Sequence, residues 1–120
     1  MPWVTKPSLN DGESIAIEFA ANRTQGWRAV GGKVWLTSSR VLFVPNAVDT
    51  STGGKGFECG RGAVSGVDVA PATLAGVPFS GGLRRRLRLR LLDGSEELFV
   101  VDGADALCAR IVTELGLGGR

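Results

Sequence analysis

Four arginines that stand two residues apart are the strongest chemical feature of this sequence: Arg84, Arg86, Arg88 and Arg90. In a β-strand, alternate side chains point to one face, and here they would be spaced by ~6.6 Å. A planar guanidinium can donate two parallel hydrogen bonds to one carboxylate or phosphate group. The row therefore predicts a shallow docking surface for an anionic membrane surface or an acidic protein surface.

The same row is also compatible with a solvated outer face that has no partner. Arginine stems can cover a sheet while the charged groups stay in water. Mutual repulsion would cost about 2 kcal/mol in water before screening by salt, which a stable domain tolerates. In this interpretation Arg90 pairs with Glu97, and Arg88 lies over the ring of Phe99. The sequence leaves both interpretations open.

Residues suited to catalysis, in contrast, are scarce. The chain of 120 residues contains no histidine, so the usual base at neutral pH is absent. Cys59 and Cys108 are distant in the sequence, and with carboxylates as the other ligands they make a poor zinc site. We therefore predict a protein that is not an enzyme, with no cofactor, no metal and no small-molecule substrate. The two cysteines are expected to be buried, reduced and inert.

The composition also disfavours nucleic acid as a partner. Proteins that bind single strands combine basic side chains with aromatic rings on which the bases stack. Aromatic residues make up 7% of the chain, tyrosine is absent, and the net charge is only +2. We expect no nucleic-acid binding.

Length and composition predict a single folded domain. A chain of 120 residues with 43% hydrophobic and 22% charged residues can bury one core without disulfides or metals. We place the domain at residues 13–116, with a lead-in at 1–12 and a tail at 117–120. No apolar run reaches the ~18 residues of a membrane span, and the N-terminus has no signal-like apolar centre. We expect a cytoplasmic protein, with a peripheral position at the inner face of the membrane if it binds lipid.

The segment 31–46 is the centre of the expected sheet. Two strand-like runs flank the polar turn at Ser38 and Ser39. If Leu36 pairs with Val41 across this turn, the alternation of strand side chains puts four apolar residues on one core face. These residues are Val34, Leu36, Val41 and Phe43, with Leu36 opposite Val41. The opposite face mixes polar and apolar side chains, which is typical of a surface that other elements cover in part.

Seven strands are expected along the chain, because short alternating apolar runs are separated by turn residues. They span residues 13–21, 27–36, 40–44, 57–59, 64–69, 83–91 and 96–101. Between them we expect a turn at 22–26, an exposed mobile loop at 46–56 and an irregular link at 71–82 that lies against the body. A β-bulge is expected at Gly31 and Gly32.

The last two strands are joined by Asp93 and Gly94, a pair typical of a two-residue type I′ hairpin turn. That turn would place Arg90 opposite Glu97. The core side chains would then be Leu87, Leu89, Leu91, Leu98 and Val100. The arginine row would share the other face with Glu97, Phe99 and Val101.

The C-terminal segment predicts one amphipathic helix that ends at Gly116. Asp102 can accept hydrogen bonds from the first turn, and Asp105 suits the positive end of the helix. The apolar stripe consists of Ala104, Leu107, Cys108, Ile111 and Leu115. The expected fold class is mainly β (α+β): a barrel or sandwich of seven antiparallel strands capped by this helix.

The segment 32–43 resembles the signature of GRAM domains. That signature has glycine, an aromatic residue, Leu-Thr, two turn residues, arginine, an aliphatic residue and phenylalanine at these spacings. The matching residues include Gly32, Trp35, Leu36, Thr37, Arg40 and Phe43. The resemblance extends over about residues 13–115 and implies a pleckstrin-homology-like fold, in agreement with the strand count and the terminal helix.

This resemblance implies a binding module for phosphoinositides, membrane surfaces or proteins. Related folds that bind inositol phosphates use basic residues near the first inter-strand loop, and here these are Arg23, Arg28 and Lys33. Thr37 and Arg40 are expected to fix the turn and to pair with backbone or a carboxylate. We predict docking to an anionic membrane surface or an acidic protein through the arginine row. The alternative is a protein–protein scaffold domain without lipid binding.

Overall fold

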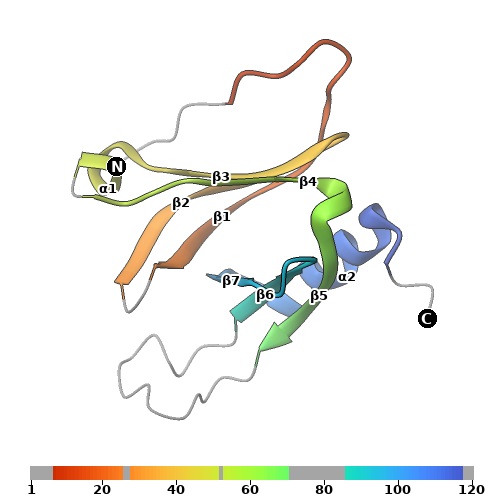
Figure 1. Cartoon of the computed structure of the whole chain (residues 1–120). Helices are drawn as coiled ribbons and strands as arrows, with labels where there is room; N and C mark the ends of the chain where they lie inside the picture. Colours follow the sequence, from red (N-terminus) through yellow and green to blue (C-terminus); the bar gives the residue numbers. More distant parts are fainter. Residues whose placement is uncertain (1–6, 26–27, 52, 71–85, 118–120) are drawn as a thin grey trace.

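The computed structural model describes residues 7–25, 28–51, 53–70 and 86–117 (Figure 1). The described elements are seven strands, two α-helices and one short 3-10 helix. In chain order they are β1 (Ile15–Gln25), β2 (Arg28–Thr37), β3 (Arg40–Pro45), α1 (Ala47–Ser51), β4 (Phe57–Gly60), η1 (Arg61–Ala63), β5 (Val64–Ala70), β6 (Arg86–Leu91), β7 (Glu96–Val100) and α2 (Ala104–Leu115). The predicted class, seven antiparallel strands followed by a C-terminal helix, is confirmed.

Strand β1 joins the two halves of the sheet. The strand order is β4-β3-β2-β1-β7-β6-β5, and every pairing is antiparallel. β1 pairs with β2 along its length but with β7 only at Asn22 and Arg23. Figure 1 shows β1–β4 lying across from β5–β7, with α2 at one end of the space between them. The rings of Phe43 and Phe99 meet across that space, with centroids 5.7 Å apart.

The hairpin of β2 and β3 forms as predicted. Leu36 pairs with Val41, and the four predicted core side chains are all buried. The expected bulge at Gly31 and Gly32 is wrong, because pairing continues through both residues, and the register shifts between Ile15 and Ile17 instead. Gly32 serves another purpose: a Cβ there would collide with the Val44 carbonyl oxygen. Glycine therefore lets β3 approach β2 closely.

The hairpin of β6 and β7 differs from the prediction by one residue. Leu91 N–H donates to Ser95 O at 2.9 Å, and Gly94 has a φ of 90°, so the loop has three residues with glycine in the left-handed position. Asp93 stabilises this turn, because its Oδ1 accepts hydrogen bonds from the Ser95 amide and hydroxyl. The two-residue turn was therefore the wrong choice.

This shift turns every side chain of β7 to the other face. Phe99 and Val101 are buried in the core, whereas the predicted core residues Leu98 and Val100 are only half-buried. Arg90 lies opposite Glu96 rather than Glu97, and Arg88 has no ring beside it because Phe99 points inward. Leu87 and Leu89 remain in the core as predicted.

Helix α2 closes the core from the end. Leu107 and Ile111 are buried, and the rest of the predicted apolar stripe packs around them: Ala104, Cys108 and Leu115. Gly116 ends the helix with a φ of 73°, as expected for a left-handed cap. The N-terminal cap is Gly103 rather than the predicted Asp102, and glycine has no side chain to cap the first turn.

Three connections complete the comparison with the predicted elements. Residues 22–25 continue β1 instead of turning, because they pair with β2 up to Gln25 and Arg28. The expected loop 46–56 contains the short helix α1. The predicted link 71–82 lies outside the described residues.

Candidate functional site

The predicted arginine row occupies the face of β6 that points away from the core. Arg84 lies outside the described residues. Arg86 is 7% exposed and therefore buried, so it cannot meet a partner in this conformation. The side chains of Arg88 and Arg90 are 23% and 46% exposed, and these two remain accessible.

Both accessible arginines are bound to carboxylates of the same chain. Arg88 donates from Nε and Nη2 to the two oxygens of Asp68 on β5, each at 2.8 Å. Arg90 donates to Asp68 at 3.2 Å and lies 3.6 Å from Glu96 on β7. The hydrogen bond from Arg88 is the main reason why the pKa of Asp68 is lowered, and the same bond raises the pKa of Arg88.

These four side chains form a charged surface that we call the arginine–carboxylate face: Asp68, Arg88, Arg90 and Glu96. Its two positive and two negative groups cancel, so the face has no net charge. The half-buried Leu98 and Val100 lie beside the arginines across the β6–β7 pairing. Such a surface offers forked donors and acceptors together rather than a purely positive field.

Arg23, the first of the predicted phosphate contacts, lies within β1 and is also paired. Its Nε and Nη2 donate to the two oxygens of Glu97 at 2.7 and 3.2 Å, and its Nη1 donates to Lys55 O at 3.2 Å. The guanidinium also lies 5.8 Å from the centre of the Phe57 ring. With a side-chain exposure of 15%, Arg23 fixes the junction of β1, β4 and β7.

The other two predicted contacts do not join Arg23 in one site. Lys33 pairs with Glu18 at 2.9 Å on the outer face of β1 and β2, and its Nζ lies 6.0 Å from the Trp35 ring. Arg28 begins β2, and its side chain lies outside the described residues. Arg23 and Lys33 thus lie on separate surfaces, and each pairs with its own carboxylate.

Gln25 restrains the loop that the sequence indicated as mobile. Its amide nitrogen donates to Gly53 O at 3.3 Å, and its Oε1 accepts from the Lys55 amide at 2.9 Å. Together with the bond from Arg23 to Lys55 O, this side chain ties residues 53–55 to the end of β1. The sequence could not show this contact, because it depends on β1 reaching Gln25.

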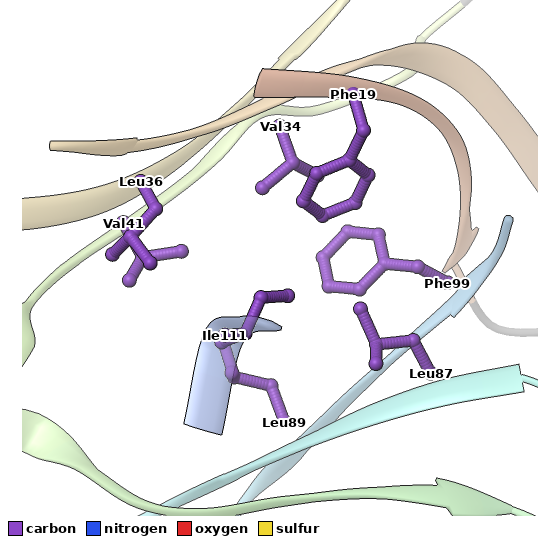
Figure 2. A pocket seen from close by; sticks show the side chains of 8 residues that line it. All are labelled: Phe19, Val34, Leu36, Val41, Leu87, Leu89, Phe99 and Ile111. Carbon is purple, nitrogen blue, oxygen red and sulfur yellow. The ribbon is translucent and has the colours of Figure 1, made fainter. Parts of the chain in front are cut away.

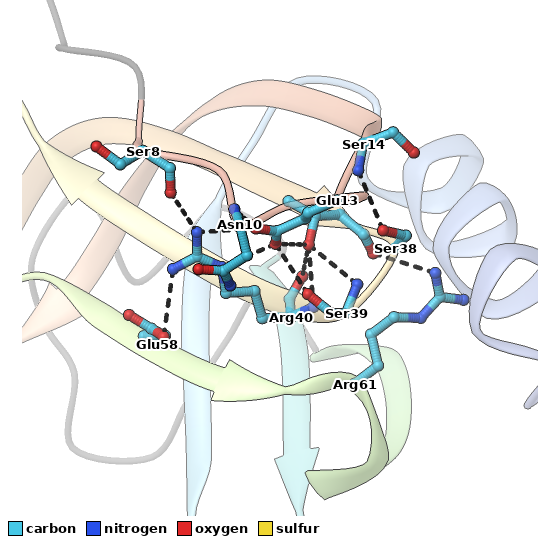
Figure 3. Close-up of polar contacts among 10 residues, drawn as sticks. Ser8, Asn10, Glu13, Ser14, Ser38, Ser39, Arg40, Glu58 and Arg61 are labelled. Carbon is cyan, nitrogen blue, oxygen red and sulfur yellow. Dashed lines mark hydrogen bonds and ion pairs between the residues drawn. The ribbon is translucent and has the colours of Figure 1, made fainter.

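The hairpin of β2 and β3 carries a polar cluster with buried side chains at its turn (Figure 3). The side chain of Glu13 is 2% exposed and accepts hydrogen bonds from Arg40 Nε at 2.8 Å, Arg40 Nη2 at 3.0 Å and Ser39 Oγ at 3.0 Å. The hydroxyl of Thr37, which is fully buried, donates to the same carboxylate. These donors hold the pKa of Glu13 far below its ordinary value, with the Arg40 bond as the largest cause.

Thr37 and Arg40 therefore have the structural roles that were predicted for them. Thr37 Oγ1 accepts hydrogen bonds from the amides of Ser39 and Arg40 at 3.1 and 3.0 Å, which fixes the β2–β3 turn. Arg40 also donates to Ser8 O and lies 3.4 Å from Glu58, so it joins the lead-in to β4. The carboxylate of Glu13 and the hydroxyl of Thr37 thus serve to hold the turn.

A second arginine, Arg61 in η1, ties this turn to the terminal helix. It donates from Nη1 to Thr37 O at 3.1 Å and from Nη2 to the backbone oxygen of Glu114. Its Nη1 also lies 3.3 Å from the Glu114 carboxylate. A cation at the C-terminal end of α2 complements the helix dipole, so Arg61 stabilises the position of the helix.

Some contacts that determine this arrangement were not predicted from the sequence. Asp68 alternates with Val67 and Val69, which indicates an outward side chain, but the sequence gives it no partner because a link as long as residues 71–82 sets no register between the strands on either side of it. Glu13 was placed at the start of the first expected strand, and its pairing with Arg40 across 27 residues depends on the tertiary structure. The alternation of Asp68 with the apolar Val67 and Val69 was the sequence signal that indicated an outward carboxylate on this strand.

The described part of the chain contains a small cavity in its core and two free cysteines. One cavity of about 20 Å³ lies in the core and is lined only by apolar side chains, so it has room for little more than a water molecule and no polar group to hold one (Figure 2). Cys59 and Cys108 are free thiols, partly buried, and burial raises the pKa of both. They are held in the unreactive thiol form.

The described residues also lack two other kinds of feature. No described helix has the length and apolar character to cross a bilayer. Within the same residues, no three Cys, Asp or Glu side chains gather closely enough to bind a metal ion.

Comparisons with known proteins support the fold. No protein-family model matches the sequence, and no curated protein matches it by sequence. The C-terminal domain of an unknown protein from Leishmania infantum is similar to this chain, with a TM-score of 0.63 and 10% identity over 88% of this chain and 86% of that one. The hSac2 domain from the human phosphoinositide phosphatase Sac2 matches with a TM-score of 0.60 and 18% identity, over 89% of this chain and 70% of that one. At these identities the likeness shows only that the overall fold is shared.

Proposed function

We propose that this chain is a non-catalytic binding module of the GRAM type, and that it docks on a protein through the arginine–carboxylate face. The carrying observation is that Asp68 and Glu96 already neutralise Arg88 and Arg90. A face without net charge gains little from a membrane surface potential, which attracts excess positive charge. A protein partner can instead match both signs and the flanking apolar side chains.

The chemistry of this face suits an acidic partner surface. Arg90 is the most exposed of its arginines, and its bonds to Asp68 and Glu96 are long, at 3.2 and 3.6 Å. A carboxylate of the partner can replace these bonds with a closer bidentate pair. The half-buried Leu98 and Val100 would supply apolar contact beside it. The absence of histidine from the whole sequence supports a role in binding rather than catalysis.

Docking on an anionic membrane surface is the second candidate. Leu92 is 71% exposed at the β6–β7 turn, two residues after the exposed Arg90, so an apolar side chain and a cation are both accessible at this end of the strand. The fold is also shared with a domain of a phosphoinositide phosphatase. Binding of this kind would weaken steeply as salt screens the charges.

The test compares both partners with the same variants. The chain is sedimented with phosphatidylcholine vesicles, with and without phosphatidylserine or phosphatidylinositol phosphates, at low and high salt. Cross-linking in cells of the source organism identifies bound proteins. We expect no salt-sensitive vesicle binding, and a cross-linked protein that is lost from the R88S/R90S double variant but kept by K33S, whose charge loss lies on another surface. Vesicle binding that disappears at high salt and in the double variant would reject the protein partner in favour of lipid.

A further inference from the structure

The first part of β1 has no described strand on one of its two sides. Residues 15–21 pair with β2 on one side, whereas pairing with β7 is confined to Asn22 and Arg23. No described strand covers the other side of residues 15–21. An unpaired edge presents a row of backbone donors and acceptors that another extended segment can complete.

A groove lies beside the beginning of this edge. It has a volume of about 380 Å³ and is lined by Ala16 and Ile17 of β1 and by one flank of α2. The residues on the helix side are Ala109, Arg110, Thr113 and Glu114. The groove exists because α2 packs chiefly on β5 and β6, and because alanines stand on both walls where larger side chains would fill it. Its size is within the range of binding pockets, which begins at roughly 300 Å³.

Arg110 gives this groove a charge preference. Its side chain is exposed, and no described residue pairs with its guanidinium, in contrast to Arg23, Arg40, Arg61, Arg88 and Arg90. The one carboxylate of the groove, that of Glu114, is already bound by Arg61 at 3.3 Å. The hydroxyl of Thr113 adds a neutral donor at the same wall. A carboxylate that enters the groove would therefore meet a forked cation that has no other partner.

We infer that this groove binds an extended acidic segment of a partner protein, which adds as a strand to residues 15–21 of β1 and places a carboxylate on Arg110. Backbone pairing to the free edge supplies affinity, and the side chains that point into the groove supply selectivity. This inference shares with the proposed function the idea of a protein partner, but it concerns a different surface. Either one can therefore fail without the other.

The other edges of the sheet are less suitable. The edge of β5 is covered by α2, where Cys108 Sγ lies 3.6 Å from Val67 O. β4 has only four residues, so it offers a short ladder to an added strand. The free part of β1 is longer than β4. The groove beside it also contains the guanidinium of Arg110, which no described residue pairs with.

A selected peptide provides the probe. Random linear peptides displayed on phage are selected on the whole chain, with R110E used for counter-selection because Arg110 is exposed and its replacement does not disturb the core. We expect peptides rich in β-branched residues with at least one acidic residue. The affinity should fall about tenfold for R110E and for A109W, which fills the groove. K55E should bind as the wild type does, because Lys55 lies at the opposite end of β1, beside Gln25.

Two measurements on the peptide separate strand addition from simple charge attraction. Replacing its acidic residue by the amide should reproduce the loss seen for R110E, and N-methylation of alternate backbone amides should abolish binding. In NMR spectra of the wild-type chain, the peptide should shift the amide signals of residues 15–21 and 109–114.

Four outcomes would overturn the inference. The first is a selection that yields no peptide, and the second is a peptide that binds R110E or A109W as well as the wild type. The third is an equal loss of binding in K55E. The fourth is a set of NMR signal shifts confined to the strands of the arginine–carboxylate face. In the last case R88S/R90S rather than R110E would lose peptide binding. That result would support the proposed function and reject peptide binding in the groove.

Discussion

Two arginines of this chain each hold a carboxylate through two hydrogen bonds of almost the same geometry, but in very different surroundings. Arg40 donates to both oxygens of Glu13 at 2.8 and 3.0 Å, and Arg88 donates to both oxygens of Asp68 at 2.8 Å. The Glu13 side chain is 2% exposed, whereas that of Asp68 is 42% exposed. The first pair is part of the architecture, and the second remains open to exchange with a partner.

The difference in burial explains why the same pair of hydrogen bonds matters for stability in one region and little in the other. A buried carboxylate has lost its water, so it needs every donor that the protein supplies, and loss of one donor leaves a costly unpaired charge. A half-exposed carboxylate can turn back to water, so its ion pair contributes little to stability. The β2–β3 region is therefore expected to respond to substitution in stability, and the β5–β7 region in binding.

The largest effect is expected where β2 and β3 approach each other most closely. G32A would push a methyl group into the backbone of Val44 and Pro45, and we expect a loss of about 3 kcal/mol in the free energy of unfolding. G66A in β5 is the matched control, because a Cβ there would lie 3.7 Å from Arg90 Cδ, an ordinary contact. Urea unfolding measures both. Equal losses would show that the two regions are packed alike.

The next largest difference is expected between the two arginines. R40A should lower Tm by several degrees, because it removes two of the hydrogen bonds of the buried Glu13 carboxylate. R88A should cost only about 0.5 kcal/mol after allowance for solvent screening, because Asp68 is 42% exposed. Thermal unfolding followed by circular dichroism checks the order. A larger loss for R88A than for R40A would contradict the burial argument.

Lowering the pH should reduce stability more through the Glu13 pair than through the Asp68 pair. The pKa of Glu13 is lower in the folded chain than in the unfolded chain, so its contribution to stability is complete above the unfolded pKa and is lost as the pH falls toward the folded value. Between about pH 5 and pH 3, Tm of the wild type should therefore fall more steeply than Tm of E13Q. D68N should reduce the slope less, since solvent screens its pairs. Parallel curves for the wild type and E13Q would reject this role of Glu13.

The smallest effect on stability and the clearest effect on binding are expected for D68N alone. The substitution removes one negative charge and leaves Arg88 and Arg90 without their shared partner. We expect a stability change of about 0.5 kcal/mol or less, together with new salt-sensitive binding to vesicles that contain phosphatidylserine. E18Q is the control, because it frees Lys33 on another surface. Vesicle binding that is unchanged by D68N would mean that neutralisation by Asp68 does not exclude lipid.

The sequence by itself determined the elements and most of the core. Val34, Leu36, Val41 and Phe43 alternate so regularly around a polar turn that one register buries all four. Leu107, Ile111 and Gly116 likewise fix the face and the end of α2. Local spacing is sufficient in these cases because the residues that interact are close in the chain or share one periodic face.

Only the tertiary structure decided which charges are satisfied. The turn at Asp93 and Gly94 permits two hairpin lengths, and the longer one placed Phe99 in the core and Arg90 beside Glu96. Asp68 reaches Arg88 across a link whose length sets no register, and Glu13 reaches Arg40 only when β1 lies beside β2. Apolar burial depends on which face a residue occupies, whereas an ion pair depends on where two atoms lie. Side-chain alternation encodes the first, and only the folded chain fixes the second.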